Sequence, residues 1–569
     1  MTAIVAVLMP TYAQAAFLPR AVASLRGQTF EDWELVIVDD ASPDDTPATV
    51  AALAADERIR YHRLAANGGL GRSLNVALDL AAADRIAYLP SDDVLLRDHL
   101  ATLLDLLGDG AVLAHTRCRP ADRILQLVQL MHRRTEDRWL ERDELESDDH
   151  ERLFLGALRG RGRTVASERV TCEWTQHPHQ RHRAIRERLD GGLNVFRQRY
   201  RVAAPLRFAP SDGALTDEVA RYARWRARPR PPRSPDGLRI LLAGELAFNP
   251  DRIVAFEERG HELLGLWADD PLHFNTVGPL PFGHVRDLPR RGWQAAVRAA
   301  APDVVYALLN WRAVPLAHEI VCAEPGIRFV FHFKEAPQRC IARGEWAMLA
   351  DVVRRADACL FATDEERAWF HAALPRLDPA RTHVMDGDLP KREWLDGALS
   401  TRLSQTDGAV HTVLLGRPYG WTDDLDRALR ERDVFVHVHA AGRSVQPQDW
   451  VEVLSRYDAG WMHVARAANG GDIRAATWDD LNVPSRTATL LAAGLPLIVP
   501  RSPAGAVSAI ERVARQTGAG VLYGDVDELA GALRDEARME AHRAAAWRAR
   551  EQFTFDAHVD RLIEILRGP

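Results

Sequence analysis

The chain has 569 residues, too many for one hydrophobic core, since cores stop growing near roughly 250 to 300 residues. Apolar residues make up 47% of the chain and charged residues 27%, which excludes a disordered or a membrane-embedded protein. The net charge is -7, whereas nucleic-acid-binding domains are usually basic, so we expect no nucleic-acid partner.

Targeting and cysteine signals are weak. No apolar run approaches the ~20 residues of a membrane span, and the start "MTAIVAVLMPTYAQ" lacks the basic residues and cleavage site of a secretory signal. We therefore predict a cytoplasmic protein. The cysteines are scattered without a C-x-x-C pair, which predicts buried or free thiols and no disulfide framework or zinc knuckle; they are Cys118, Cys172, Cys322, Cys340 and Cys359.

The first part of the chain alternates short apolar runs with helical patterns. Strand-helix-strand alternation at this spacing predicts an α/β fold, with a parallel sheet and helices on both faces. Ligand sites of such sheets lie at the carboxyl ends of the strands. The residues just beyond the predicted strands are Pro10, Asp39, Asp40, Asp92 and Asp93.

Composition shifts divide the chain. Residues 221–237 are rich in Arg and Pro with little to bury, which predicts a linker. Two further strand-helix series follow and predict two similar lobes that face each other across a cleft. The expected domains are residues 1–220, 238–400 and 401–569.

Asp92 and Asp93 stand side by side after the apolar run "RIAYLP". Such a pair can bind Mg²⁺ or Mn²⁺, and the ion can neutralise a departing diphosphate. Alternatively, both residues open the next helix, because Asp favours caps and first turns. Taken alone, the two interpretations are equally supported.

Three further features of the same half favour a nucleotide site. Asp40, in "VIVDDAS", is suited to accept a hydrogen bond from a base edge or ribose, and Tyr12 offers a ring for stacking. The loop "NGGLGRSLN", which starts at Asn67, has glycines that permit close backbone approach. Each has an ordinary alternative as a turn or cap, but their order and spacing are harder to explain in that way.

These motifs resemble family 2 glycosyltransferases of the GT-A fold. The matching blocks are "MPTYAQ", in which Ala13 replaces the usual Asn, "QTFEDWELVIVDDAS", the pattern Asn67, Gly69 and Asn75, and "PSDD". Pro90 occupies the position of the first acid in the last block. The resemblance spans about residues 4–182. It implies a nucleotide-diphosphate sugar donor and a divalent cation, with donor contacts from Pro10, Tyr12, Asp40, Asn67 and Asp92.

The resemblance also implies catalytic roles. In "SDDHERLFLGALRGRG", Asp148 and Asp149 form the acidic pair of the family, and the second acid is its usual general base. The alternative is an Asp pair that caps a helix. In "WTQHP", His177 corresponds to a third metal ligand beside Asp92 and Asp93, with His179 or His182 as alternates.

The C-terminal part carries a second set of motifs. In "NVPSRTATLLAAGLPLIVP" a helix is expected to end at Gly494, while its start presents backbone N–H groups and Arg486 to an anion. A buried helix packed between strands is the alternative. The order resembles GT-B glycosyltransferases similar to family 4, over about residues 238–567, with Thr489 in place of the usual Glu. The implied donor-binding residues are Gly244, Arg417, Asn482, Pro484, Ser485, Arg486 and Thr489.

We therefore predict a GT-A glycosyltransferase module followed by a two-lobed GT-B module. The first would transfer a sugar, with inversion, to a glycan, glycolipid or protein-glycan acceptor. The second would transfer another sugar or only bind a glycan or nucleotide, and His332 is a catalytic candidate there against the alternative of a buried or surface histidine. Linker arginines would allow contact with the inner membrane face, although a solvated linker explains them equally well.

Two other classes of protein are the rivals. One is a non-catalytic glycan-binding scaffold. The other is a nucleotidyltransferase, but the glycine- and lysine-rich phosphate loop expected near its N-terminus is replaced here by "MPTYAQ".

Overall fold

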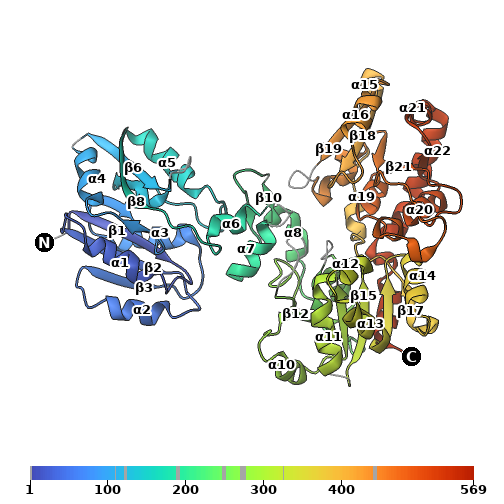
Figure 1. Ribbon diagram of the computed structural model, residues 1–569, viewed down its shortest axis with the longest axis horizontal. Coiled ribbons are helices and arrows are strands. Elements are labelled where there is room, and N and C mark those ends of the chain that lie inside the picture. Colours follow the sequence, from blue (N-terminus) through green and yellow to red (C-terminus); the bar gives the residue numbers. More distant parts are fainter. Residues whose placement is uncertain are drawn as a thin grey trace. The chain divides into compact units, whose positions relative to one another are not determined.

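The structure is a computed structural model, and its description covers residues 3–108, 110–120, 125–187, 192–213, 215–246, 251–269, 277–309, 311–323, 326–439 and 445–569. It divides into two compact units, drawn in Figure 1. Unit 1 contains residues 1–186 and 206–217, and unit 2 contains residues 187–205 and 218–569.

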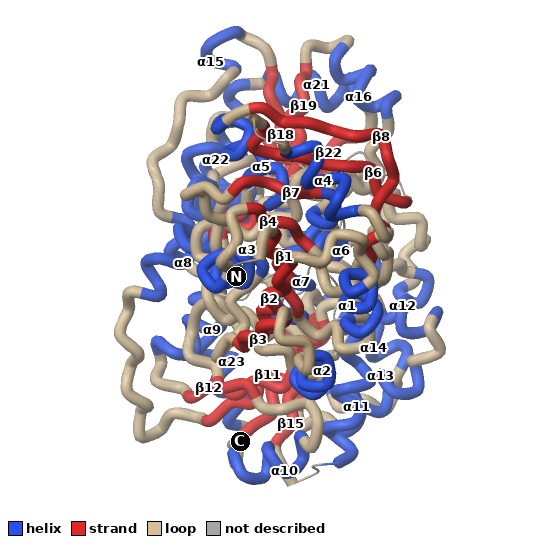
Figure 2. The backbone as a smooth tube through the Cα atoms, turned by 90° about the vertical axis from the view of Figure 1, so that its left-hand side faces the viewer, coloured by secondary structure: helices blue, strands red, loops and turns tan. Residues whose placement is uncertain are grey.

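Unit 1 is built on an eight-stranded sheet with the order β3-β2-β1-β4-β7-β6-β8-β5. Figure 2 shows β3, β2, β1 and β4 side by side in this order. The strands are β1 (Val5–Thr11), β2 (Trp33–Asp39), β3 (Ile59–Arg63), β4 (Arg85–Tyr88), β5 (Val94–Leu95), β6 (Ala111–Arg119), β7 (Leu130–Arg133) and β8 (Arg163–Glu173), with a separate pair β9 (Arg207–Phe208) and β10 (Thr216–Asp217).

The sheet of unit 1 is mixed, which corrects the prediction of a wholly parallel sheet. Strands β3, β2, β1 and β4 pair in parallel, as expected, but β7 runs antiparallel to both β4 and β6. The segment between β6 and β7 is too short for a helical crossover, and a parallel connection needs one.

Helices cover both faces of this sheet, as predicted. Along β1, Val5 and Val7 share a core with α1 and α4, whereas Ala6 and Leu8 share the opposite core with α3 and α5. The alternation follows from the two-residue period of a strand. The helices are α1 (Leu18–Arg26), α2 (Thr46–Leu53), α3 (Leu70–Leu80), α4 (His99–Leu107), α5 (His150–Arg161) and α6 (Arg181–Ile185).

Unit 2 contains two parallel sheets, in the orders β13-β12-β11-β14-β15-β16-β17 and β19-β18-β20-β21-β22. Both are Rossmann-like, with strand-helix alternation. The strands are β11 (Arg239–Gly244), β12 (Glu262–Trp267), β13 (Arg286–Asp287), β14 (Val304–Leu309), β15 (Arg328–Phe333), β16 (Ala358–Phe361), β17 (Thr382–Val384), β18 (Val410–Leu415), β19 (Val434–His439), β20 (Ala459–Trp461), β21 (Leu497–Pro500) and β22 (Gly520–Tyr523).

The last helix returns to the first of these sheets. Val559, Leu562 and Leu566 of α23 belong to the core that contains Ile240 and Tyr306 of the first sheet. The expected lobe 401–569 thus ends in a helix packed on the other lobe. The helices are α7 (Gly192–Tyr200), α8 (Glu218–Arg226), α9 (Arg252–Glu258), α10 (Trp293–Ala300), α11 (Val314–Ala323), α12 (Pro337–Ala342), α13 (Trp346–Arg355), α14 (Asp364–Ala373), α15 (Ser404–Asp407), α16 (Asp423–Arg430), α17 (Trp450–Leu454), α18 (Trp478–Leu481), α19 (Arg486–Ala492), α20 (Ala509–Thr517), α21 (Val526–Arg534), α22 (Glu536–Ala549) and α23 (Val559–Arg567).

The predicted linker 221–237 begins inside a helix, because α8 carries Tyr222 and Trp225 into the core of unit 2. Arg228 of this segment pairs with Glu258 and Glu393 of unit 2. The expectation that this segment has little to bury is therefore wrong at its N-terminal end. The prediction rested on the Arg and Pro content and overlooked Tyr222 and Trp225, which are three residues apart and so lie on one face of the helix.

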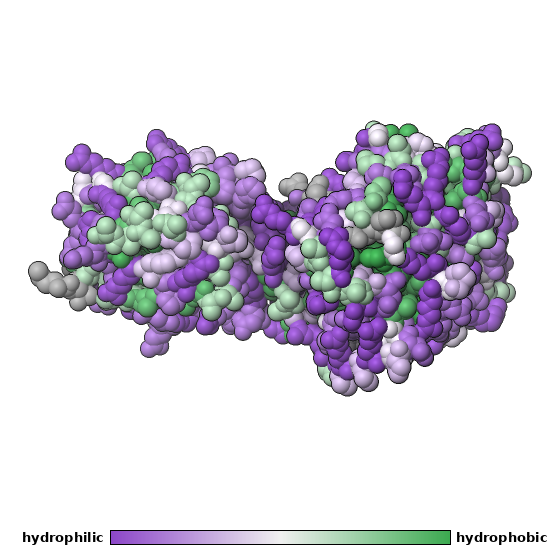
Figure 3. All heavy atoms as spheres, turned by 90° about the horizontal axis from the view of Figure 1, so that it is seen from below, coloured by the Kyte–Doolittle hydropathy of each residue, from purple (hydrophilic) through white to green (hydrophobic). Residues whose placement is uncertain are grey.

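The surface and the thiols agree with a globular chain. In the described part of the chain, no helix combines the length and the apolar character that a membrane crossing requires. Hydrophilic residues cover most of the face in Figure 3, with apolar residues between them. All five cysteines are free thiols, as predicted; only Cys322 is exposed and the other four are buried.

A pair of helical glycines in unit 1 tests the packing. A Cβ added at Gly71 in α3 would overlap the carbonyl oxygen of Leu140, whereas one at Gly156 in α5 has nothing within 4 Å. We expect Gly71→Ala to lower the free energy of unfolding by about 1–3 kcal/mol through overpacking. Gly156→Ala should raise it by about 0.5–1 kcal/mol through helix propensity. Calorimetry of both variants would measure this, and equal effects would contradict the packing at Gly71.

Candidate functional site

The parallel register of unit 1 gathers several strand ends at one edge of the sheet. Thr11 at the end of β1 pairs with Asp39 at the end of β2, and Leu8 pairs with Tyr88 at the end of β4. The residues that follow these strands therefore share this edge. Asp40, Asp92 and Asp93 follow their strands as expected, whereas Pro10 and Asp39 lie inside β1 and β2, which corrects the prediction that they lie just beyond these strands.

Asp92 and Asp93 lie in a turn between β4 and β5. The backbone N–H of Asp93 donates to the carbonyl of Pro90 (3.0 Å). Helix α4 begins only at His99, with Asp98 at its N-cap. The alternative that Asp92 and Asp93 open this helix is therefore wrong, since a short strand follows them instead.

A second strand pairing delivers the metal-ligand candidate His177. Leu95 of β5 pairs antiparallel with Cys172 of β8, so the segment after β8 lies beside the turn. His177 Nε2 is 2.9 Å from Asp92 Oδ2, and the Thr175 N–H donates to Asp93 Oδ1 at 2.9 Å. Two of the three predicted metal ligands are thus in direct contact, while Asp93 bonds to the backbone.

The surroundings of this pair suit a cation. Burial and the neighbouring charge of Asp92 raise the pKa of Asp93 well above its usual range. His177 stacks on Phe17 with ring centroids 4.8 Å apart, which orients the imidazole. The Nδ1 atom of His177 is buried without a hydrogen-bond partner among the described residues. A carboxylate and an imidazole are ligands that Mn²⁺ and similar divalent ions accept.

Sequence reasoning missed two residues at this site. Gln14 Nε2 donates to Asp92 Oδ2 (3.3 Å), and the amide oxygen of Gln14 accepts from Ser91. Arg20 donates to the Asp92 carbonyl and to Thr175 Oγ1, both at 2.7 Å. Gln14 lies in the quoted "MPTYAQ" block, which was a usable signal. Arg20 lies on the exposed side of α1 and belongs to no motif, so no sequence signal pointed to it.

Asp40 organises the loop that was expected to approach a nucleotide. Its two carboxylate oxygens accept the N–H groups of Gly68 (2.6 Å) and Gly69 (2.9 Å), and its carbonyl accepts from Asn67 Nδ2 (3.1 Å). Burial raises the pKa of Asp40 to about 6, against the lowering effect of the two N–H groups. The positive φ of Gly69 (90°) explains the glycine there.

The remaining residues that were predicted to bind the nucleotide sugar differ in solvent exposure. Pro10 is buried within β1, whereas Tyr12, just after the strand, is half-buried. Thr11 Oγ1 and Asn67 Oδ1 are buried without hydrogen-bond partners among the described residues. Unpaired buried polar groups are costly to a fold.

The two acids of the predicted catalytic pair have different surroundings. Asp148 accepts the N–H and the Oγ–H of Ser211, both at 2.7 Å, and pairs with Arg186. These donors outweigh burial and hold the pKa of Asp148 below its usual value. Asp149 occupies the N-cap position of α5, yet its side chain makes no cap hydrogen bond and pairs with Arg152 (2.5 Å). Asp148 is thus held by contacts with Ser211 and Arg186, whereas the side chain of Asp149 contacts the side chain of Arg152.

In unit 2, the basic candidates meet at the carboxyl ends of the second sheet. Arg486 Nη2 donates to the carbonyl of Arg417 (2.6 Å), and Arg417 Nη1 donates to the Tyr419 hydroxyl (3.0 Å). Burial and the charge of Arg417 lower the pKa of Arg486 to about 10. Arg486 Nη1 and Asn482 Oδ1 are buried without hydrogen-bond partners among the described residues. An anion would relieve this pair of like charges.

The two ends of α19 were also part of the expectation for unit 2. Helix α19 ends at Ala492 with Ala493 as its C-cap, and Gly494, with φ of 68°, follows one residue beyond this cap instead of forming it as predicted. In addition, two N–H groups at the start of this helix are already used: those of Thr487 and Ala488 donate to the carbonyls of Pro484 and Ser485. They are thus less available to an anion than expected. Thr489 is half-buried on the same helix.

Gly244 ends β11 with φ of 105°. The catalytic expectation for His332 is wrong, because this side chain is buried between the Tyr306 hydroxyl (2.6 Å) and the Met385 carbonyl (2.9 Å). Burial lowers the pKa of His332 to about 3. His332 therefore remains a neutral core residue.

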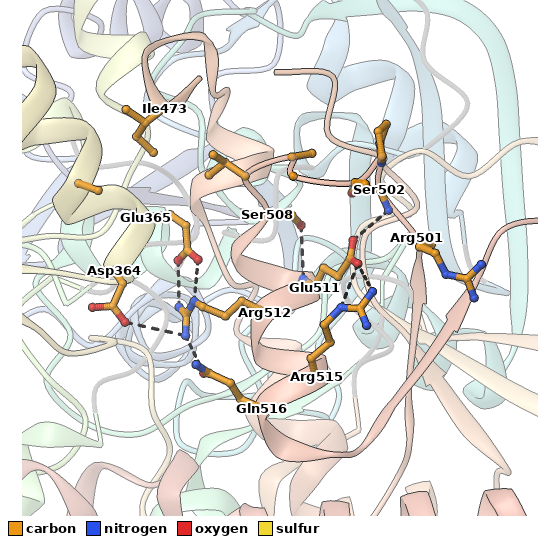
Figure 4. Close-up of a pocket in the computed structure, with 16 residues that line it drawn as sticks. Asp364, Glu365, Ile473, Arg501, Ser502, Ser508, Glu511, Arg512, Arg515 and Gln516 are labelled. Carbon is orange, nitrogen blue, oxygen red and sulfur yellow. Dashed lines mark hydrogen bonds and ion pairs between the residues drawn. The ribbon is translucent and has the colours of Figure 1, made fainter. Parts of the chain in front are cut away.

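A pocket of about 950 Å³ lies between α14 and α20 in unit 2 (Figure 4). Four of its charged side chains point toward one another in pairs, whereas Arg501 points away from them. Arg512 forms a bidentate pair with Glu365 (2.6 and 2.9 Å), and Arg515 pairs with Glu511 (2.6 Å). The Arg512–Glu365 pair joins the two halves of unit 2. With these charges paired, the pocket is a weaker anion site than the surroundings of Arg486.

The comparison with known families concerns unit 1. Residues 6–161 match the family described as "Glycosyl transferase family 2". Unit 1 thus carries a family 2 glycosyltransferase domain with a GT-A-like fold, and the resemblance to this family is confirmed. The GT-B resemblance of residues 238–567 stays a prediction.

Curated relatives match the same region. A GalNAc(5)-diNAcBac-PP-undecaprenol beta-1,3-glucosyltransferase of Campylobacter jejuni is 34% identical over 110 residues, which cover 18% of this chain and 34% of the relative. The succinoglycan biosynthesis protein ExoW of Rhizobium meliloti is 41% identical over 98 residues, which cover 16% of this chain and 31% of the relative. The chain spans about a third of the length of these relatives.

Solved structures show a weaker likeness. TarS 1-349 of S. aureus in complex with UDP-GlcNAc is 20% identical with a TM-score of 0.28, covering 32% of this chain and 60% of that chain. The mannosyltransferase PcManGT from Pyrobaculum calidifontis, in complex with GDP-Man and Mn²⁺, is 21% identical with a TM-score of 0.29, covering 36% and 65%. These scores are too low to carry a conclusion about this chain.

The raised pKa of Asp40 predicts a pH-dependent stability. Between its usual value of 3.8 and about 6, Asp40 releases its proton in the unfolded chain but keeps it in the folded one. Its contribution to stability is therefore full below about pH 4 and is lost as the pH rises to about 6, by up to about 3 kcal/mol. Thermal unfolding at several pH values should show the wild type losing stability relative to Asp40→Asn over this range. The exposed Asp45→Asn should keep the wild-type slope, and parallel curves for Asp40→Asn would refute the assignment.

Proposed function

We propose that the protein transfers a sugar from a nucleotide-diphosphate sugar to a glycan, glycolipid or protein-glycan acceptor at the carboxyl edge of the unit 1 sheet. The observation that carries this proposal is the contact of Asp92 with His177 at 2.9 Å, beside the buried Asp93. The family 2 match over residues 6–161 supports the reaction class.

In the proposed reaction, Asp149 accepts the proton of the acceptor hydroxyl as that oxygen attacks the anomeric carbon. Attack opposite the leaving diphosphate inverts the configuration. Asp149 is 8% exposed, and its partner Arg152 is a largely exposed side chain, so this ion pair is weakly held and can open to an acceptor. Partial burial of a carboxylate favours its use as a base.

Asp92 and His177 would hold a divalent cation, Mn²⁺ or Mg²⁺, with Asp93 as the third predicted ligand. When bound, this ion neutralises charge on the diphosphate. The fit rests on the oxygen and nitrogen donors in contact and on the raised pKa of Asp93, which a nearby positive charge would lower. Pro90 removes one acid of the usual cluster, and Gln14 supplies an amide beside Asp92 in addition.

Asp40 and the loop from Asn67 to Gly69 would hold the nucleoside. Asp40 fixes this loop through two backbone N–H groups, and the Asn67 amide oxygen and the Thr11 hydroxyl have no hydrogen-bond partner within the described part of the chain. Tyr12 would stack on the base. The proposal assigns no base or sugar, because these contacts suit several.

For unit 2 we propose a GT-B module that binds the diphosphate of a second sugar nucleotide through Arg417 and Arg486, assisted by Asn482. Arg486 Nη1, which is buried and has no hydrogen-bond partner among the described residues, favours this role. Two activities in one chain are the stronger form of this proposal. A unit 2 that only binds a nucleotide or glycan is the weaker form.

The general base can be tested by a matched pair of substitutions. We expect Asp149→Asn to lower the transfer rate by about 10²–10⁴-fold, because the acceptor proton loses its base, with an unchanged melting temperature. Asp148→Asn should instead lower the melting temperature, since it weakens the contacts with Arg186 and Ser211. The measurement is metal-dependent release of nucleoside diphosphate from a panel of sugar nucleotides, with acceptor present. Normal transfer by a folded Asp149→Asn protein would refute the assignment.

The second site can be tested in the full chain with the first site disabled. In the Asp149→Asn background, residual transfer should fall at least tenfold on addition of Arg486→Ala, because the diphosphate loses its buried cation. Arg515→Ala, which removes a surface ion pair from α20, is the control. If the Asp149→Asn chain shows no residual transfer with any donor, the two-activity form is wrong. Unchanged donor binding after Arg486→Ala would reject the binding form as well.

A further inference from the structure

Three potential metal ligands meet on the surface of unit 2, and none of them belongs to the sites described above. His318 and Cys322 are four residues apart on α11, so both project from one face of this helix. Asp351 comes from α13, which packs beside α11 in Figures 1 and 2. Among the described residues, this is the one group of three such side chains whose ligand atoms all lie within 4.8 Å of one another.

The distances are close to those of a tetrahedral site. His318 Nε2 is 3.0 Å from Asp351 Oδ2 and 3.7 Å from Cys322 Sγ. Ligand atoms bound to one tetrahedral Zn²⁺ are separated by about 3.3–3.6 Å. The same nitrogen faces both other ligands, so small side-chain rotations would place all three around one ion.

The helices that carry the ligands are rigidly placed. Ile320 of α11 and Leu349 and Val353 of α13 are buried in one core cluster, so the backbones are fixed from the inner side. Arg355 donates to Asp351 Oδ2 at 2.7 Å and orients the carboxylate. A site supported by a packed core and an outer hydrogen bond needs little ordering when an ion binds.

We propose that His318, Cys322 and Asp351 form a binding site for Zn²⁺, with water as the fourth ligand. A thiolate, an imidazole and a carboxylate form a mixed set that suits Zn²⁺, whereas Mg²⁺ requires oxygen ligands. As the Zn–S bond forms, Cys322 gives its thiol proton to solvent, and neutral His318 binds through Nε2. The ion crosslinks α11 to α13 and stabilises this side of unit 2.

The single exposed cysteine makes the site measurable in the full-length protein. Cys322 is exposed, while the other four thiols are buried, so alkylation by iodoacetamide, followed by peptide mass spectrometry, reports on Cys322. We expect Zn²⁺ to slow this alkylation at least tenfold and Mg²⁺ to leave it unchanged. The zinc concentration needed for protection should fall as the pH rises, because binding releases a proton.

Variants separate a three-ligand site from zinc bound to the thiol alone. His318→Ala and Asp351→Asn should each lose at least tenfold of the protection. His284→Ala is the matched control, because His284 also faces a carboxylate, Glu257 (3.3 Å), but has no role in the cluster. Co²⁺ should give a thiolate-to-metal absorption band that Cys322→Ser abolishes. Equal protection in the His318→Ala protein, or no protection in the wild type, would overturn the proposal.

Discussion

The parallel pairing of β1 between β2 and β4 is the constraint on which the candidate site depends. All seven residues of β1 and all seven of β2 are buried, so a one-residue slip would move every side chain into the core on the opposite face, where its neighbours do not fit it. Because parallel strands end at the same edge, this register brings Asp39, Asp40 and the turn with Asp92 together. The other strands, β7, β6, β8 and β5, extend the sheet beyond β4 and leave the pairing of β1 with β2 and β4 unchanged.

A second pairing completes the arrangement. The two residues of β5 bind the end of β8, and this small contact sets the position of the segment from Thr175 to His177 beside Asp92 and Asp93. The cost of burying two adjacent carboxylates is visible in the raised pKa of Asp93. Buried charge without a nearby partner is unfavourable, and a divalent cation would offset it. The carboxylates that are costly to bury, Asp92 and Asp93, are thus the same ones that are proposed to bind the cation.

Unit 2 also has parallel sheets with residues gathered at their carboxyl ends, but the charges there differ from those of unit 1. The two halves of unit 2 are joined by the ion pair of Arg512 on α20 with Glu365 on α14, and by α23, which packs on the first sheet although it follows the second in sequence. At the carboxyl ends of the second sheet the charges are basic, with Arg417 and Arg486 in contact. An acidic edge in unit 1 suits a cation, and a basic edge in unit 2 suits an anion.

The sequence alone determined the alternation of strands and helices, the strand-end positions of Asp40, Asp92 and Asp93, and the family 2 resemblance, because apolar periodicity and local motifs are short-range signals. Only the tertiary structure decided that Asp92 contacts His177, that Asp148 is held by Ser211 and Arg186, and that His332 is buried. It also decided that β7 pairs antiparallel with β4 and β6, and that α23 packs on the first sheet of unit 2. These features depend on pairings between residues far apart in the chain, and a local pattern shows which face is apolar but not which partner covers it.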